Sequence, residues 1–360
     1  MGCTLALALS RHGLRVALQS DRDLGNGTRS PDVRAYALNA GSVALLRELK
    51  VWDALPGDAR TAVYDMHIEG DAAGGALDFS AWSQGVDALA WIVDAPELEG
   101  ALTSALSFAP HVHLVDSAVE VPATLLALAE GKDSATRERL GVAMPVQRYG
   151  QRAVAARLQS DTVHAGVARQ WFRSPDVLAL LPFDRPEAER SYALVWSVPD
   201  ERADALMAMD DAAFEQALGD ATALAAGTLR LGSPRASWPL LLARAERVCG
   251  PGWVLLGDAA HVVHPLAGQG LNLGLADVRA LVDVLVAREP WRALGDDKLL
   301  HRYARRRAGP TRAMGQLTDG LLQLFASDTP VVRELRNRGL SLVNALPGLK
   351  RLLASQALES

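Results

Sequence analysis

The fold is decided by the stretch Trp253–Asp277, which reads WVLLGDAAHVVHPLAGQGLNLGLAD. Its apolar start predicts a buried strand that delivers Asp258 to the carboxyl edge of an α/β sheet, where ligands bind. Gly268 and Gly270 lack a Cβ, so the backbone there can approach a ligand closely. The helix predicted over 270–287 directs its positive end at the same place. This pattern predicts a site for an anionic or electron-rich ligand.

A strand, loop and helix joined by glycines could also be a plain connection. Six spaced features favour a ligand site instead: the strand, Gly257-Asp258, His261, Pro265, Gly268-Gln269-Gly270 and Asn272. His261 and His264 lie three residues apart, which suits a metal in principle. No third ligand accompanies them, so we predict no metal site.

Composition narrows the classes of function. The chain has 360 residues, enough for about two packed units, and a net charge of −5 that argues against nucleic acid. Cys3 and Cys249 are its two cysteines, which fits a reducing cytoplasm. We find neither a signal peptide nor an apolar run that could span a membrane. The basic run 302–307 reads better as a solvated helix face than as a contact with an anionic surface.

Hydrophobic periodicity sets out the order of elements. It predicts helices at 2–12, 39–50, 96–107, 210–219 and 270–287, and strands at 14–18, 64–69, 112–115, 124–129, 153–158, 167–172, 177–181, 192–197 and 253–256. The pattern is α/β at both ends with a β-rich insertion between them. We therefore predict one discontinuous domain of residues 1–62, 93–146 and 245–325. A second domain takes 63–92 and 147–244, and helices follow at 326–360.

The Trp253–Asp277 pattern resembles the second flavin-binding motif of the para-hydroxybenzoate hydroxylase fold, and more closely that of the ubiquinone-biosynthesis hydroxylases. Further stretches carry the resemblance over nearly the whole chain: Arg34 to Leu38, Tyr149 to Gln151, Gln170 to Phe172, Leu180 to Pro182 and Asp319 to Arg351. It implies a Rossmann-like FAD-binding domain interrupted by a β-sheet-rich substrate domain, with a helical C-terminus. Trp171 and Trp196 could line an aromatic pocket, but core positions are the commoner use.

The resemblance also implies roles for individual residues. Asp258, after Gly257, would bind the ribityl or pyrophosphate region of FAD, and Pro265 would lie beside the flavin ring. Arg34 would lie near the pyrophosphate or the ring. The backbone of Gly268, Gln269, Gly270, Leu271 and Asn272 would contact the pyrimidine edge of the flavin.

The sequence departs from the family pattern at three places. Gly2 stands where the third glycine of a GxGxxG turn belongs, and we expect the preceding strand and glycines to be encoded upstream. Ser20, followed by Asp21, stands where an acid for the adenosine ribose is usual. Glu130-Gly131 replaces an Asp-Gly pair that serves both FAD and NAD(P)H.

The reaction implied is hydroxylation of a polyprenylated phenol by O2, FAD and NAD(P)H, in ubiquinone biosynthesis. The cofactor performs the hard step, so no catalytic side chain is predicted. Residues 340–353 suit either peripheral contact with the inner face of the membrane or packing on the protein. Membership of a biosynthetic complex or a homo-oligomer stays open. Two alternatives remain: a flavin-dependent reductase of isoprenoids, and a non-catalytic binding protein on the same scaffold.

Overall fold

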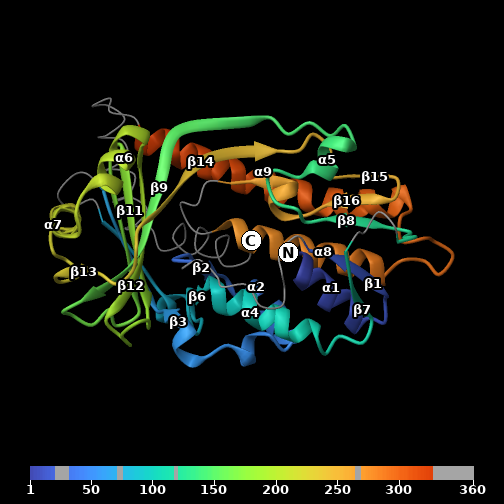
Figure 1. Cartoon of the computed structure of the whole chain (residues 1–360), viewed down its shortest axis with the longest axis horizontal. Helices are drawn as coiled ribbons and strands as arrows, with labels where there is room; N and C mark the ends of the chain where they lie inside the picture. The colour runs from blue at the N-terminus through green and yellow to red at the C-terminus, as the bar shows by residue number, and fades with distance from the viewer. Residues whose placement is uncertain (21–31, 71–75, 117–120, 264–268, 327–360) are drawn as a thin grey trace.

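The computed structural model describes residues 1–20, 32–70, 76–116, 121–263 and 269–326. Pro265, Gly268, His264, Asp21 and the predicted membrane-contact segment 340–353 lie outside these ranges. The described chain forms two sheet-containing halves that lie side by side. Helix α8 lies in the half that holds the N-terminus, and the long α9 runs from that half toward the other (Figure 1). The mixed α/β class predicted from the sequence is confirmed.

One half is built on a nine-stranded sheet that is antiparallel except where β10 meets β4. Its order is β17 (His261–Val262), β14 (Ala236–Arg244), β9 (Val146–Ser160), β12 (Ser191–Pro199), β11 (Asp176–Phe183), β10 (Val167–Arg173), β4 (Asp65–Glu69) and β5 (Ala76–Ser80), with β13 (Leu229–Leu231) on β9. Side chains alternate between the two faces of a strand. Val154, Ala156 and Leu158 therefore share one face of β9 and join one core. We call this half the substrate half.

Two helices cover that face of the sheet, α6 (Asp200–Ala208) and α7 (Asp211–Thr222) (Figure 1). Helix α7 confirms the helix predicted over 210–219, whereas α6 was not predicted. Asp210 explains the break between the two helices, because its side chain accepts a hydrogen bond from the Ala213 amide and starts a new helix. Phe214 of α7 packs into the same core as Trp171 and Trp196, which confirms the core interpretation of the tryptophans.

The other half, which we call the cofactor half, has three small sheets. They are the parallel pair β1 (Val16–Gln19) and β7 (Val112–Val115), the sheet β15 (Cys249–Gly250), β16 (Trp253–Leu255) and β8 (Leu126–Leu128), and the sheet β2 (Ala35–Leu38), β6 (Ala90–Asp94) and β3 (Arg60–Val63). Gly2 lies between the first two sheets, since an added Cβ would be 3.6 Å from Leu18 Cδ1 and 3.9 Å from Ala129 Cβ. The sheets themselves remain unpaired with each other in the described chain.

Helices surround these sheets. They are α1 (Gly2–Arg11), α2 (Ala40–Glu48), α4 (Ala95–Leu106), α8 (Gln269–Val286) and α9 (Asp297–Ala326), with the short α3 (Ala81–Gln84) and α5 (Ala135–Arg139) and the 3-10 turns η1 (Trp52–Ala54), η2 (Gly57–Ala59) and η4 (Gly257–Ala259). None of the helices in the described ranges is both long and apolar enough to cross a bilayer. Residues 63–92 divide, since β4 and β5 join the large sheet while β6 pairs with β2. The domain boundaries stay a prediction.

A buried carboxylate joins the strand, the turn and the two long helices. Asp277 of α8 accepts a hydrogen bond from the Gly257 amide at 2.9 Å and pairs with His261 Nε2 at 2.7 Å. Its other oxygen accepts from Arg307 Nε of α9 at 2.6 Å. Burial alone raises the pKa of Asp277, but the hydrogen bond from His261 and the charge of Arg307 outweigh it and the pKa lies below its ordinary value. The ionised form of Asp277 therefore holds the η4 turn in place.

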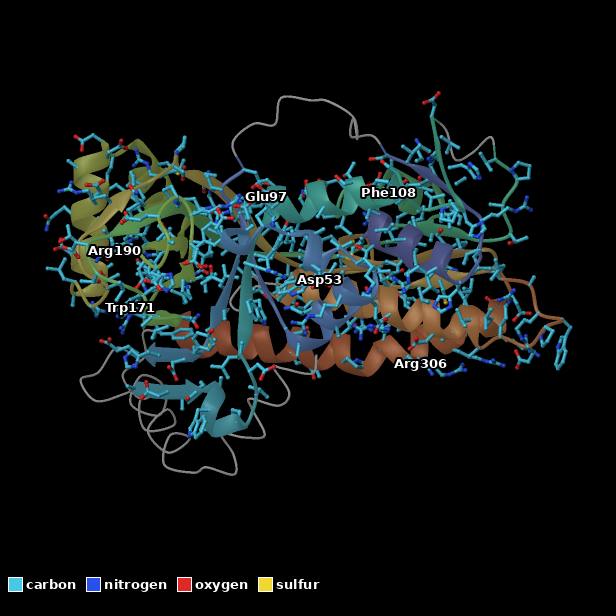
Figure 2. The ribbon with its side chains drawn as sticks, turned by 90° about the horizontal axis from the view of Figure 1, so that it is seen from below. Asp53, Glu97, Phe108, Trp171, Arg190 and Arg306 are labelled. Atoms are coloured by element: carbon cyan, nitrogen blue, oxygen red, sulfur yellow. The ribbon has the colours of Figure 1, made fainter. Side chains whose placement is uncertain are left out.

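Replacing Phe214 by alanine tests the core of the substrate half. Phe214 is fully buried, so Phe214→Ala should lower the free energy of unfolding by about 3–5 kcal/mol. Phe108, labelled in Figure 2, is 87% exposed and provides the matched control. Phe108→Ala should change stability by less than about 0.5 kcal/mol. Urea unfolding followed by circular dichroism measures both, and equal effects would contradict this assignment of the core.

Asp277→Asn should destabilise the fold in a pH-dependent way. Loss of the carboxylate leaves Arg307 buried without its charged partner, at a cost of about 3 kcal/mol near neutral pH. Folding lowers the pKa of Asp277 from 3.8, so its contribution is complete well above that value and is lost as the pH falls through the folded pKa. The melting temperatures of wild type and Asp277→Asn should differ most at about pH 7 and converge below about pH 4. The exposed Asp53→Asn is the control, and a pH-independent difference would refute the argument.

Candidate functional site

Asp258 is presented by the η4 turn directly after β16. Gly257 has φ +56°, and an added Cβ would lie 2.9 Å from Met1 Cγ, so this turn requires glycine. Solvent reaches the Asp258 side chain, yet desolvation by the surrounding protein raises its pKa. The charges of His261, Arg34 and Lys132 act against that shift. Asp258 is therefore a reachable carboxylate in a partly enclosed, charged setting.

Two helices begin beside this turn. Met1 precedes α1 and packs against α8, since an added Cβ on Gly274 would lie 2.7 Å from Met1 Sδ. At the start of α8, a Cβ on Gly270 would meet no atom of the described residues within 4 Å. Helix N-termini offer free amides and positive potential to an anion. The start of α1 thus lies against Gly257 through Met1, and Gly274 and Asp277 of α8 lie beside the same turn.

Arg34 immediately precedes β2. Its guanidinium holds Asp32 through hydrogen bonds of 2.5–3.0 Å and approaches Glu99 Oε1 at 3.6 Å. Tyr36 lies beside it, with Arg34 Cζ 5.9 Å from the ring centroid, and burial raises the pKa of the Tyr36 hydroxyl. The charge of Asp258 helps to raise the pKa of Tyr36, and the charge of Arg34 limits the rise in the pKa of Asp258. The start of β2 therefore lies in the same neighbourhood as Asp258.

Asn272 has a role that the sequence did not predict. Its side-chain oxygen accepts from the Asn39 amide at 3.1 Å and from Ser42 Oγ at 2.8 Å, and its Nδ2 donates to the Ala37 carbonyl at 2.8 Å. The buried amide therefore fixes the first turn of α8 to β2 and α2. Leu271 packs at the edge of the large core. The predicted contact of the 268–272 backbone with a cofactor stays a prediction.

Glu130 is largely occupied within its own loop. Its carboxylate accepts hydrogen bonds from Ser134 Oγ, from the Thr136 amide and from Thr136 Oγ1, and so stabilises the start of α5. Gly131 follows with φ +80°, a conformation that favours glycine. Arg137 donates to the carbonyls of Lys132 and Ala259, which brings this loop beside the η4 turn. A ligand in the site would meet the backbone and Lys132 of this loop more readily than Glu130.

Sequence reasoning missed three charged residues that organise the site: Asp277, Arg307 and Arg157. Asp277 and Arg157 interrupt otherwise apolar stretches, LGLADVRAL and AVAARL, whose neighbours are largely buried. A charge within a buried run needs a partner, and this was the available signal. The identity of each partner could not be read from the sequence, because Arg157 meets a carbonyl 123 residues away.

These residues fit FAD. Helix starts suit a pyrophosphate, and Asp258, which accepts no hydrogen bond from the residues that the structure describes, could accept them from the hydroxyls of a sugar alcohol. Arg34 adds a cation with several donors, and Gly270 leaves space for close approach of a ring. Ser20 is exposed at the end of β1, where an adenosine ribose is expected.

Comparison with known proteins agrees with this geometry. Residues 107–318 match the family described as FAD binding domain. The chain is 31% identical over 393 residues to 3-demethoxyubiquinol 3-hydroxylase of Escherichia coli (strain K12), covering 99% of this chain and 96% of that protein. It is 30% identical to ubiquinone hydroxylase UbiL of Rhodospirillum rubrum, covering 99% and 87% of the two chains.

Solved structures show the same fold. The crystal structure of p-nitrophenol 4-monooxygenase PnpA from Pseudomonas putida DLL-E4 superimposes with a TM-score of 0.75 at 17% identity, covering 99% of this chain and 95% of that chain. Together these matches confirm the enzyme class and the FAD predicted from the sequence. The chain belongs to the FAD-binding monooxygenases of the ubiquinone hydroxylase family, with a fold like that of p-hydroxybenzoate hydroxylase.

Proposed function

We propose that this protein hydroxylates the aromatic ring of a prenylated phenol on the route to ubiquinone, with FAD, NAD(P)H and O2. The observation that carries the proposal is Asp258, a solvent-reachable carboxylate in the η4 turn, whose neighbour Gly257 lies against Met1 at the start of α1 and Gly274 of α8. The similarity over 99% of the chain to a 3-demethoxyubiquinol 3-hydroxylase supports the class of substrate. Bound FAD supplies the redox chemistry, and the protein supplies its binding, orientation and surroundings.

The residues of the cofactor half take complementary parts in holding FAD. Asp258 accepts hydrogen bonds from the ribityl hydroxyls. The amides that begin α1 and α8 meet the negative parts of the cofactor, and Arg34 adds its charge nearby. The side chains of Asn272 and Asp277 hold these elements in place through hydrogen bonds within the protein.

The substrate half offers an apolar wall. On β9, Ala153 and Ala155 alternate with the core residue Val154, so they lie on the face opposite α6 and α7. Arg157 shares that face and reaches the Arg34 carbonyl, so the face is turned toward the cofactor half. Val195 pairs with Ala155 in the neighbouring strand. This face is apolar, and Ala153 and Ala155 are buried in it, so it would exclude water from a substrate bound beside it.

Heavy-oxygen labelling tests the reaction. The purified protein would be incubated with FAD, NADPH, ¹⁸O2 and a prenylated phenol, and the product analysed by mass spectrometry. We expect one ¹⁸O atom in the product. A product that gains hydrogens but no oxygen would point to an isoprenoid reductase instead. A protein that binds the phenol yet forms no product, with FAD bound, would support the non-catalytic alternative.

Asp258→Asn should weaken FAD binding. An amide presents one acceptor where the carboxylate presents two charged ones, and loss of a charge-assisted hydrogen bond typically costs about 1.5–3 kcal/mol, or at least tenfold in Kd. Quenching of FAD fluorescence on titration measures the Kd. Asp220→Asn, an exposed position on α7, should leave the Kd unchanged. An unaltered Kd for Asp258→Asn would remove Asp258 from the cofactor site.

A further inference from the structure

Two arginines of the substrate half reach across to the start of α4. Arg185, which follows β11, binds Asp58 at 2.8–2.9 Å and Glu97 Oε1 at 2.7 Å. Arg157 of β9 approaches Asp94 Oδ2 at 3.4 Å. Glu97 is labelled in Figure 2 at the end of α4 that lies toward the substrate half. Both arginines thus join the two halves at the same helix end, but their surroundings differ.

Arg157 is the buried member of the pair, 7% exposed. Its guanidinium stacks on Phe183, with Cζ 4.1 Å from the ring centroid, and its Nη1 has no hydrogen-bond partner in the described residues. Burying a cation with one orphan donor is costly unless the remaining contacts are strong. Joining the two halves does not by itself require a buried cation, because Arg185 also joins them and is more exposed than Arg157.

The strongest contact of Arg157 is with backbone rather than with an acid. Its Nη2 donates to the carbonyl oxygen of Arg34 at 2.6 Å. The same oxygen accepts the Ala95 amide at 3.3 Å, so Arg157 acts where β2 and α4 both begin. From this point β2 runs to Ala37, whose carbonyl accepts from Asn272 at the start of α8. Arg157 therefore fixes one end of a strand whose other end is fixed to the cofactor helix.

We propose that Arg157 is a positioning residue for the cofactor: by binding the Arg34 carbonyl it sets where the Arg34 side chain stands relative to FAD. The inference rests on the proposed cofactor site. Through this contact, the sheet that forms the substrate wall also determines the placement of a cofactor-binding side chain. Arg185 binds side chains only and has no such connection to β2 among the residues described.

The experiment compares Arg157→Met, Arg157→Lys and the matched control Arg185→Met in the full chain. Methionine fills the buried site without charge, and lysine can still donate to the carbonyl. We expect Arg157→Met to raise the Kd for FAD about tenfold, the size of one charge-assisted hydrogen bond, and Arg157→Lys to restore part of the affinity. Arg185→Met should stay within about twofold of wild type. The visible circular dichroism of bound flavin should change for Arg157→Met alone.

A double mutant separates positioning from simple stabilisation. If Arg157 acts through Arg34, adding Arg157→Met to Arg34→Ala should raise the Kd for FAD no further. Equal effects of Arg157→Met and Arg185→Met, or full additivity with Arg34→Ala, would overturn the inference. If Arg157→Met does not fold, the same comparison is made with Arg157→Lys. A wild-type Kd and flavin spectrum for Arg157→Lys, or a loss of affinity that is fully additive with Arg34→Ala, would likewise overturn the inference. Wild type that binds no FAD would overturn the proposed function too, and is recognised without any variant.

Discussion

The site depends first on the buried carboxylate of Asp277. It receives the Gly257 amide, His261 and Arg307, and so joins the end of β16 to α8 and α9. Gly257 has a positive φ and no side chain to hold it, so its position is set by what binds its amide. Asp258 follows Gly257 directly, so its placement depends on the buried carboxylate of Asp277. A satisfied buried network of this kind rigidifies the turn it supports.

Two further polar contacts extend this frame. Asn272 lies on the first turn of α8 and holds β2 and α2 through three hydrogen bonds, and Arg157 holds the other end of β2 from the substrate half. Each uses a side chain to satisfy backbone groups at the ends of elements, where helices and strands leave them unpaired. The apolar cores stabilise each half, whereas these polar contacts set the halves in register around the site.

The sequence predicted the helices and strands of the site better than the side-chain hydrogen bonds that hold them together. Trp253–Asp277 sufficed for β16, the η4 turn and α8, because an apolar strand, glycines and an amphipathic helix are local patterns. The position of Asp258 followed from them. The resemblance implied that the backbone around Asn272 contacts the cofactor, which stays a prediction. The side-chain bonds of Asn272 were not predicted, because their partners Asn39 and Ser42 lie more than 200 residues away in the sequence. The helix start at Asp210 was predicted correctly, but α6 before it was missed because its apolar residues form only a weak amphipathic pattern.

The charges around the site show how it can accept an anionic cofactor without a basic cluster. Arg34 is already matched by Asp32 and Glu99, and Asp258 adds another negative charge. Among the groups described, side chains alone therefore leave little positive excess for a pyrophosphate. Another source of positive potential is the backbone, because helix N-termini such as those of α1 and α8 offer free amides to an anion. Backbone amides are already fixed by the helix, so no flexible side chain has to be ordered when they bind an anion. They therefore favour a cofactor that is bound through the placement of the amides more than through net charge. This explains why so many contacts of the fold serve to fix those two helix ends.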